Sequence, residues 1–105
     1  MFARLVNMRL KHNVVYEFNM TMERDVLPLL RKQKGFRDEL TLVASNGIDV
    51  VKVSLWDRRQ DAENYDCEAY TQVQEMLSEV TEGTPQVQNY DVSLSTAHET
   101  IAQPA

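Results

Sequence analysis

The sequence predicts a small α+β domain in which strands and helices follow one another in the order β-α-β-β-α-β. Four segments alternate apolar and polar residues with the period of a strand, and two longer segments repeat apolar residues with the period of a helix. With 105 residues, the chain has the size of one domain. We expect residues 1–96 to form this domain and residues 97–105 to form a short flexible tail.

The first strand and the first helix are expected over residues 2–10 and 13–33. The strand places four apolar side chains on one side, namely Phe2, Val6, Met8 and Leu10. The helix carries a stripe of Val15, Phe18, Met22, Val26, Leu29 and Leu30. Pro28 lies within that stripe. Because proline lacks an amide hydrogen and crowds the carbonyl four residues earlier, we expect a kink or break near Arg24–Asp25.

Two strands are expected over residues 36–44 and 48–56. They are separated by Ser45-Asn46-Gly47, and the pair Asn-Gly is typical of a tight hairpin. The two strands should therefore be antiparallel neighbours. In the first of them, Phe36, Leu40 and Leu42 are expected to share a side, and in the second the corresponding residues are Val51, Val53 and Leu55.

The second helix is expected over residues 60–81 and the last strand over residues 86–95. The helix shows an unbroken apolar stripe of Ala62, Tyr65, Ala69, Val73, Met76, Leu77 and Val80. Gly83-Thr84-Pro85 follows it and is expected to end the helix before the strand begins.

This order of elements predicts a ferredoxin-like arrangement, with both helices on one face of a four-stranded antiparallel sheet. The other face carries apolar side chains on at least two strands. Leaving them in water would cost about 25 cal/mol per Å² of apolar area. A second copy of the chain, packed sheet against sheet, would cover them. We therefore expect a homodimer.

The charge balance and the cysteine content exclude several classes of function. The net charge of −5 disfavours binding to nucleic acid or to an anionic membrane surface. The single cysteine, Cys67, cannot form an intrachain disulfide, which favours a reducing compartment. No apolar run approaches the roughly 20 residues that cross a bilayer, and the start of the chain lacks the apolar segment of a signal peptide. A cytoplasmic location is expected.

Several local patterns, spread over nearly the whole chain, are similar to those of a known family. They are Leu29-Leu30-Arg31 before Lys34-Gly35-Phe36, then Val53-Ser54-Leu55-Trp56 with Asp57, then Gln60-Asp61-Ala62-Glu63 with Tyr65, and the closing strand after Pro85. The chain thereby resembles the antibiotic biosynthesis monooxygenase-like family, whose members form dimeric α/β barrels. The resemblance implies a cofactor-independent monooxygenase that acts on a small aromatic or quinol-like molecule. In such enzymes a substrate with an acidic phenol or enol is deprotonated and itself reacts with dioxygen.

The family also has a haem-degrading branch, which uses an asparagine, a tryptophan and a histidine. Carried over to this chain, these positions fall on Asn7, on Tyr65 and near Glu75. Only the asparagine is retained, and a carboxylate is a poor replacement for imidazole as a haem ligand. A haem-binding or haem-degrading function is therefore disfavoured, and no cofactor is expected.

Three residues are candidates for catalysis: Asn7, Asp66 and Tyr65. Asp66 lies beside the apolar stripe of the second predicted helix, where it is interpreted as an acid or base in a pocket. Alternatively, its side chain reaches water or an arginine of the sheet. Asn7 shares a strand face with Arg9, and the two would orient a substrate oxygen or carboxylate, or else belong to a polar sheet face or a dimer contact.

The candidates for contact with a flat apolar ligand, besides Arg9, are the aromatic residues Trp56, Tyr16 and Tyr70. A tryptophan at the position of Trp56 more often packs in a core or an interface, whereas the tyrosines could equally be partly exposed or lie at a dimer contact. The two histidines, His12 and His98, have no cysteine or clear carboxylate partner in the sequence, so no metal site is expected.

Two functional hypotheses follow. The first is a small-molecule oxygenase with a pocket between the helices and the sheet of each protomer. The second is a non-catalytic dimer that binds a small ligand, or whose pocket has closed. A cavity of several hundred Å³ would favour the first hypothesis, and a solid interior would favour the second.

Overall fold

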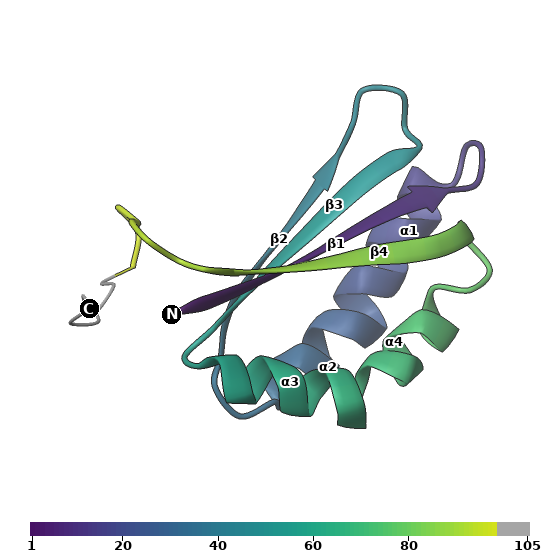
Figure 1. Cartoon of the computed structure of the whole chain (residues 1–105). Helices are drawn as coiled ribbons and strands as arrows, with labels where there is room; N and C mark the ends of the chain where they lie inside the picture. Colours follow the sequence, from purple (N-terminus) through teal and green to yellow (C-terminus); the bar gives the residue numbers. More distant parts are fainter. Residues whose placement is uncertain (99–105) are drawn as a thin grey trace.

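The computed structural model describes residues 1–98 and contains one four-stranded antiparallel sheet (Figure 1). The strands are β1 (Phe2–Leu10), β2 (Phe36–Val43), β3 (Asp49–Trp56) and β4 (Thr81–Asp91), in the spatial order β2-β3-β1-β4. All helices lie on one face of this sheet, as Figure 1 shows. The predicted α+β ferredoxin-like fold is confirmed. The predicted tail, residues 97–105, falls mostly outside the described residues.

The first helical region consists of α1 (Val15–Thr21), a π-helical segment η1 (Met22–Val26) and α2 (Leu27–Arg31). The break predicted near Arg24–Asp25 therefore lies inside η1. Pro28 cannot donate to the carbonyl of the residue four positions earlier, and a π-helical turn is one way for the backbone to accommodate that loss. Phe18, Val26 and Leu30 nevertheless remain fully buried, so the apolar stripe continues through the irregular turn.

The second helical region is also divided, into α3 (Arg59–Glu68) and α4 (Tyr70–Met76). The sequence pattern predicted one helix over residues 60–81, which is wrong at the centre and at the end. At Ala69 the backbone leaves the helical region, with φ −131° and ψ −20°. Because Tyr65, Ala69 and Val73 are all buried on the same side, the apolar period gave no sign of the break.

Strand β4 begins at Thr81, five residues before the predicted start. Gly83-Thr84-Pro85, which was expected to precede the strand, therefore lies inside it. The register against β1 shifts between Asn7 and Arg9, which creates a bulge opposite this segment. Gly83 has a φ of 71°, a left-handed conformation that glycine adopts without strain and that is common at bulges. Pro85 is tolerated because β4 is an edge strand.

The two faces of the sheet differ in what covers them. The face toward the helices carries the core, which includes Phe2, Val6, Met8, Leu10, Val50 and Trp56. The opposite face, called here the open face, is defined by the cross-strand pairs Leu40–Val53, Leu42–Val51, Leu5–Val53 and Ala3–Tyr90. Phe36 was expected on the same side as Leu40 and Leu42, but a register shift between Phe36 and Asp38 moves it to the helix side.

None of the helices within residues 1–98 is long and apolar enough to span a bilayer.

Candidate functional site

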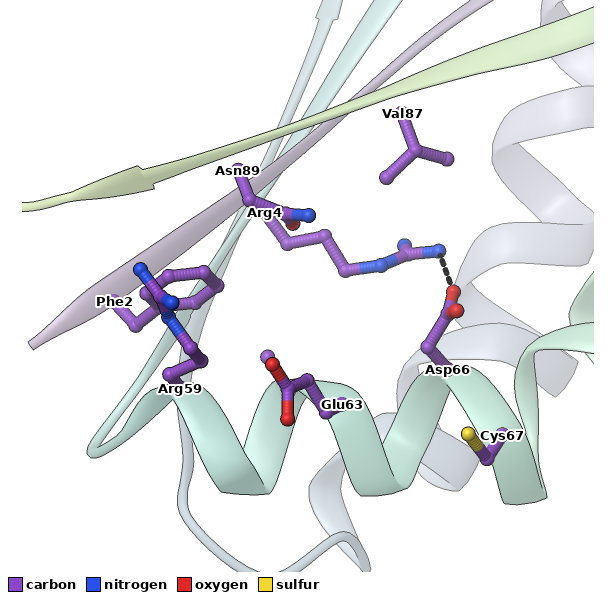
Figure 2. A pocket seen from close by; sticks show the side chains of 9 residues that line it. Phe2, Arg4, Arg59, Glu63, Asp66, Cys67, Val87 and Asn89 are labelled. Carbon is purple, nitrogen blue, oxygen red and sulfur yellow. Dashed lines mark hydrogen bonds and ion pairs between the residues drawn. The ribbon is translucent and has the colours of Figure 1, made fainter.

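A pocket of about 460 Å³ lies between α3 and the β1–β4 side of the sheet (Figure 2). It is called here the α3 pocket, and its lining residues are Phe2, Arg4, Arg59, Ala62, Glu63, Asp66, Cys67, Val87 and Asn89. Its volume lies in the usual range for small-molecule sites. Most of its polar groups come from α3 on one side, and Arg4 faces them from β1.

Arg4 is the central polar group of the α3 pocket. Strand alternation places it on the helix side of β1, between the buried Phe2 and Val6. Its guanidinium Nη2 donates a hydrogen bond to Asp66 Oδ1 over 2.6 Å, as the dashed line in Figure 2 marks. The Arg4 side chain is 4% exposed, whereas that of Asp66 is 52% exposed. The pair therefore joins a buried cation to a half-solvated anion.

Two tyrosine rings complete the surroundings of Arg4. The guanidinium carbon lies 4.1 Å from the ring centroid of Tyr70 and 5.3 Å from that of Tyr65. Both distances fall within the range of cation–π attraction. Burial raises the pKa of both phenols, and the positive charge of Arg4 opposes this shift. Both tyrosines are therefore neutral groups near physiological pH.

A row of polar side chains continues from Arg4 across the helix side of the sheet. The strand register aligns Arg4 with Ser54 and Ser54 with Glu39, while Lys52 is buried beside them on β3. Burial lowers the pKa of Lys52, and the negative charge of Glu39 opposes that change. Burial raises the pKa of Glu39, and Lys52 opposes this in turn. The two groups thus reduce each other's cost of burial.

Of the residues proposed from the sequence, only Asp66 lines the α3 pocket. Its partner is an arginine of the sheet, which was the structural alternative considered for it. Tyr65 lies in the core behind the pocket, against Arg4. Tyr70 also contacts Arg4, and its ring centroid lies 6.2 Å from that of Tyr65. The structure therefore groups Asp66, Tyr65 and Tyr70 around one residue that the sequence analysis did not single out.

The remaining proposed residues lie elsewhere. Trp56 is fully buried, packs 5.1 Å from Tyr65 between ring centroids, and donates from Nε1 to Ser54 Oγ over 2.9 Å. Tyr16 is 73% exposed on α1. Asn7 and Arg9 occupy odd positions of β1, so strand alternation turns them to the open face, away from the α3 pocket. They therefore do not meet Asp66, contrary to the expectation that all these residues share one pocket.

The positions implied by the haem-degrading branch do not form one site in this protomer. Asn7 is on the open face, Tyr65 is in the core on the opposite side, and Glu75 is exposed on α4. This arrangement does not fit a haem held by these three positions. Within residues 1–98, no group of three or more histidine, cysteine, aspartate or glutamate side chains is placed to hold a metal ion.

The sequence itself indicates that Arg4 belongs to a polar site. The other side chains on the helix side of β1 are all apolar and belong to the core, namely Phe2, Val6, Met8 and Leu10. A charged residue among them must be buried, and a buried charge requires a partner. An arginine on the apolar side of a strand is therefore itself evidence for a polar site.

Comparison with known proteins places this geometry in a familiar fold. No family model matches the sequence, and no curated protein is detectably similar. Among solved structures, a monooxygenase of Streptomyces coelicolor in complex with the ligand nanaomycin D has a TM-score of 0.72 and 16% identity, covering 99% of this chain and 92% of its own. SnoaB, a cofactor-independent oxygenase from Streptomyces nogalater, has a TM-score of 0.72 and 14% identity, and the match covers 92% of this chain and 98% of SnoaB.

Another similar structure is a candidate antibiotic biosynthesis monooxygenase from Bordetella bronchiseptica, with a TM-score of 0.75 and 11% identity over 89% of this chain and 97% of its own. A protein of unknown function from Nitrosomonas europaea is equally alike, with a TM-score of 0.74 and 10% identity over 94% and 95%. At such identities, a likeness establishes the fold and leaves the activity open. This chain has the fold of the antibiotic biosynthesis monooxygenase structures, and the resemblance stated from its sequence is confirmed at that level.

Proposed function

We propose that this protein is a cofactor-independent monooxygenase that oxidises a small aromatic or quinol-like molecule in the α3 pocket. The observation that carries the proposal is the buried guanidinium of Arg4, which lines a pocket of about 460 Å³ and has Asp66 beside it. A buried cation attracts an anionic ligand strongly, because little water screens its charge. The deprotonated form of a phenol or enol is such an anion, and it is also the form that reacts with dioxygen.

Arg4 and Asp66 would have complementary roles in this reaction. The substrate carries a CH₂ group whose carbanion is delocalised onto a phenol or carbonyl oxygen. Asp66 accepts a proton from this CH₂ group, and Arg4 holds the oxygen on which the negative charge collects. Asp66 is half exposed, so it can exchange protons with solvent. Placing the cation where charge develops lowers the barrier to deprotonation.

Oxygen transfer then needs no electrons from outside. The carbanion passes one electron to dioxygen, and the resulting substrate radical and superoxide combine into a peroxide, which takes back a proton from Asp66. Loss of one water molecule converts the peroxide into a carbonyl. Overall, one dioxygen molecule oxidises one CH₂ group to a carbonyl and forms one water, so the substrate supplies all four electrons.

Dioxygen uptake tests this proposal. The purified protein is mixed with a panel of quinols, anthrone-type ketones and polyphenols, and uptake is recorded with an oxygen electrode. Arg4→Met should reduce uptake about 100-fold with the active substrate, the usual effect of losing one group that stabilises developing charge. Arg24→Met is the matched control, because Arg24 is an exposed arginine that also pairs with an aspartate, Asp25, but lies on η1 outside the α3 pocket. No uptake with any compound, or equal loss in both variants, would contradict the proposal; binding without uptake would favour the non-catalytic ligand-binding dimer.

We also propose that the protein forms a homodimer through the open face. Support comes from the apolar side chains exposed there, since Leu40, Leu42 and Tyr90 are each at least half exposed. Leu40 and Leu42 adjoin the half-buried Val53 and Val51, and Tyr90 adjoins Ala3. Burying them against a second copy would recover the hydrophobic free energy that an isolated protomer lacks.

Sedimentation velocity tests the dimer. Leu42→Glu places a charge among the apolar side chains of the open face and should shift the protein from dimer to monomer. Tyr16→Glu is the control, since Tyr16 is exposed on α1 and far from this face. A wild-type protein that sediments as a monomer at all concentrations would contradict the proposal.

A further inference from the structure

A second cavity lies on the same side of the sheet as the α3 pocket. This α4 pocket has a volume of about 270 Å³, and its walls include Met8, Tyr70, Val73, Leu77 and Pro85. The α3 pocket meets β4 at Val87 and Asn89, whereas the α4 pocket meets it from Thr81 to Pro85. The helix side is divided in the same way, between α3 and α4. The two cavities therefore lie end to end between β4 and the divided helix.

One contact joins a residue that lines the first cavity to a residue that lines the second. Arg4 lines the α3 pocket, Tyr70 lines the α4 pocket, and the Arg4 guanidinium carbon lies 4.1 Å from the centroid of the Tyr70 ring. The α4 pocket is lined by apolar side chains together with the polar Gln74, Ser78 and Thr81, while the α3 pocket holds the ion pair. The Tyr70 ring, stacked on the Arg4 guanidinium, therefore lies where the two cavities approach each other.

The ring of Tyr70 is held by packing rather than by hydrogen bonding. Its hydroxyl is buried and has no well-aligned hydrogen-bond partner among residues 1–98, although the Arg4 guanidinium lies close enough to favour the ionised phenolate. Tyr70 is also the first residue of α4, directly after the backbone break at Ala69. Removing or replacing this side chain therefore sacrifices packing against Arg4 and Tyr65 but no hydrogen bond of the described structure.

We infer that Tyr70 is a specificity-determining residue that closes the inner end of the α3 pocket and so limits the length of the ligand. In the direction of the α4 pocket, a ligand whose anionic group binds Arg4 meets the Tyr70 ring. Without that ring, the two chambers become one continuous site, and an additional apolar ring can occupy the α4 pocket. This inference rests on the proposed function for the anionic group of the ligand, and it concerns binding rather than chemistry.

The test uses two air-stable probes with the same anionic group and different lengths, 2-naphthoate and 6-phenyl-2-naphthoate. Their dissociation constants are measured by isothermal titration calorimetry. In Tyr70→Ala, affinity for the longer probe should rise about tenfold, because its extra ring gains an apolar chamber, while affinity for 2-naphthoate should stay within about twofold. Tyr70→Phe keeps the ring and should change neither value more than about twofold. If both probes respond equally to Tyr70→Ala, or neither responds, the inference is wrong.

Two further measurements keep the result decisive. Tyr70→Leu retains an apolar side chain, and should show the same selective gain for the longer probe if Tyr70→Ala does not fold. Dioxygen uptake is measured separately on the wild type. Selective binding without uptake would overturn the oxygenase proposal and leave the role of Tyr70 standing, whereas uptake without selective binding would overturn only the role of Tyr70.

Discussion

Substituting the two partners of the Arg4–Asp66 ion pair should reduce the free energy of unfolding by different amounts. Asp66→Ala leaves the Arg4 cation in place with only 4% of its side chain exposed and without its counter-ion. Removing one partner of a fully buried pair costs about 3–5 kcal/mol. Because Asp66 is half exposed and Arg4 keeps its stack on Tyr70, we expect a loss of about 2–3 kcal/mol in the free energy of unfolding.

The reverse substitution should cost much less. Arg4→Met keeps a side chain of similar length in the core, and the carboxylate of Asp66, which is 52% exposed, turns to water. The expected loss is about 1 kcal/mol, mainly from the cation–π contact. The double variant should then be about as stable as Arg4→Met alone, because it contains no unpaired buried charge. The two substitutions would therefore couple by about 2–3 kcal/mol.

Urea unfolding at one fixed protein concentration measures these differences. For a domain of this size, Asp66→Ala should also lower the melting temperature by about 10–20 °C. The reasoning is refuted if the two single variants are equally unstable, or if the double variant loses the sum of the two single losses. Either result would mean that the burial of Arg4 is not what makes the pair necessary.

Three other perturbations test neighbouring features. Burial raises the pKa of Tyr65 above the value of about 10 expected in the unfolded chain, so the contribution of the neutral phenol to stability is present below about pH 10 and is lost as the pH rises above it. In urea unfolding between pH 8 and 11, the free energy of unfolding should therefore fall less with pH for Tyr65→Phe than for the wild type. The same pH dependence in both proteins would contradict this. Lys52→Met removes the positive charge that opposes the raised pKa of Glu39, so that pKa should rise further; side-chain carboxyl NMR measures it, and an unchanged value counts against the coupling. Gly35→Ala should destabilise the protein by about 2 kcal/mol or more, because Gly35 has a φ of 79° and a methyl group there would overlap the buried side chain of Asp61; thermal unfolding with a loss below about 0.5 kcal/mol would exclude that overlap.

The fold could be predicted from the sequence because it depends on periodic burial. The even positions of β1 and β3 are buried against the helices, and this alternation is visible in the amino-acid order. The irregular turn near Arg24 was also predictable, because the cause is local and lies four residues away at Pro28. In such cases the pattern and the structure follow from the same steric and hydrophobic constraints.

The errors arise where register or backbone geometry interrupts that period. The side that Phe36 faces depends on a bulge opposite β3, and the early start of β4 depends on a bulge opposite β1. A bulge adds one or more unpaired residues without changing the apolar pattern enough to be recognised. The break at Ala69 is hidden for a related reason, since the buried stripe runs through it.

The candidate site was predicted only in part. Asp66 was found because a carboxylate beside an apolar stripe is conspicuous, but its partner was not. Arg4 belongs to the opposite element, 62 positions away, and only the tertiary structure brings the two together. Asn7 and Arg9 were selected by resemblance and by their shared strand face, and alternation then placed both on the side away from Arg4.

The most direct test of the central claim is the fate of the oxygen atoms. With the substrate identified by the uptake panel, the reaction is run briefly under ¹⁸O-labelled dioxygen and the product is analysed by mass spectrometry, with a parallel run in ¹⁸O-labelled water to measure carbonyl exchange. The account predicts one labelled oxygen atom per molecule of product, almost complete loss of product with Arg4→Met, and retention of product with Arg24→Met. A product that carries no label from dioxygen, or hydrogen peroxide formed in its place, would contradict a monooxygenase at this site.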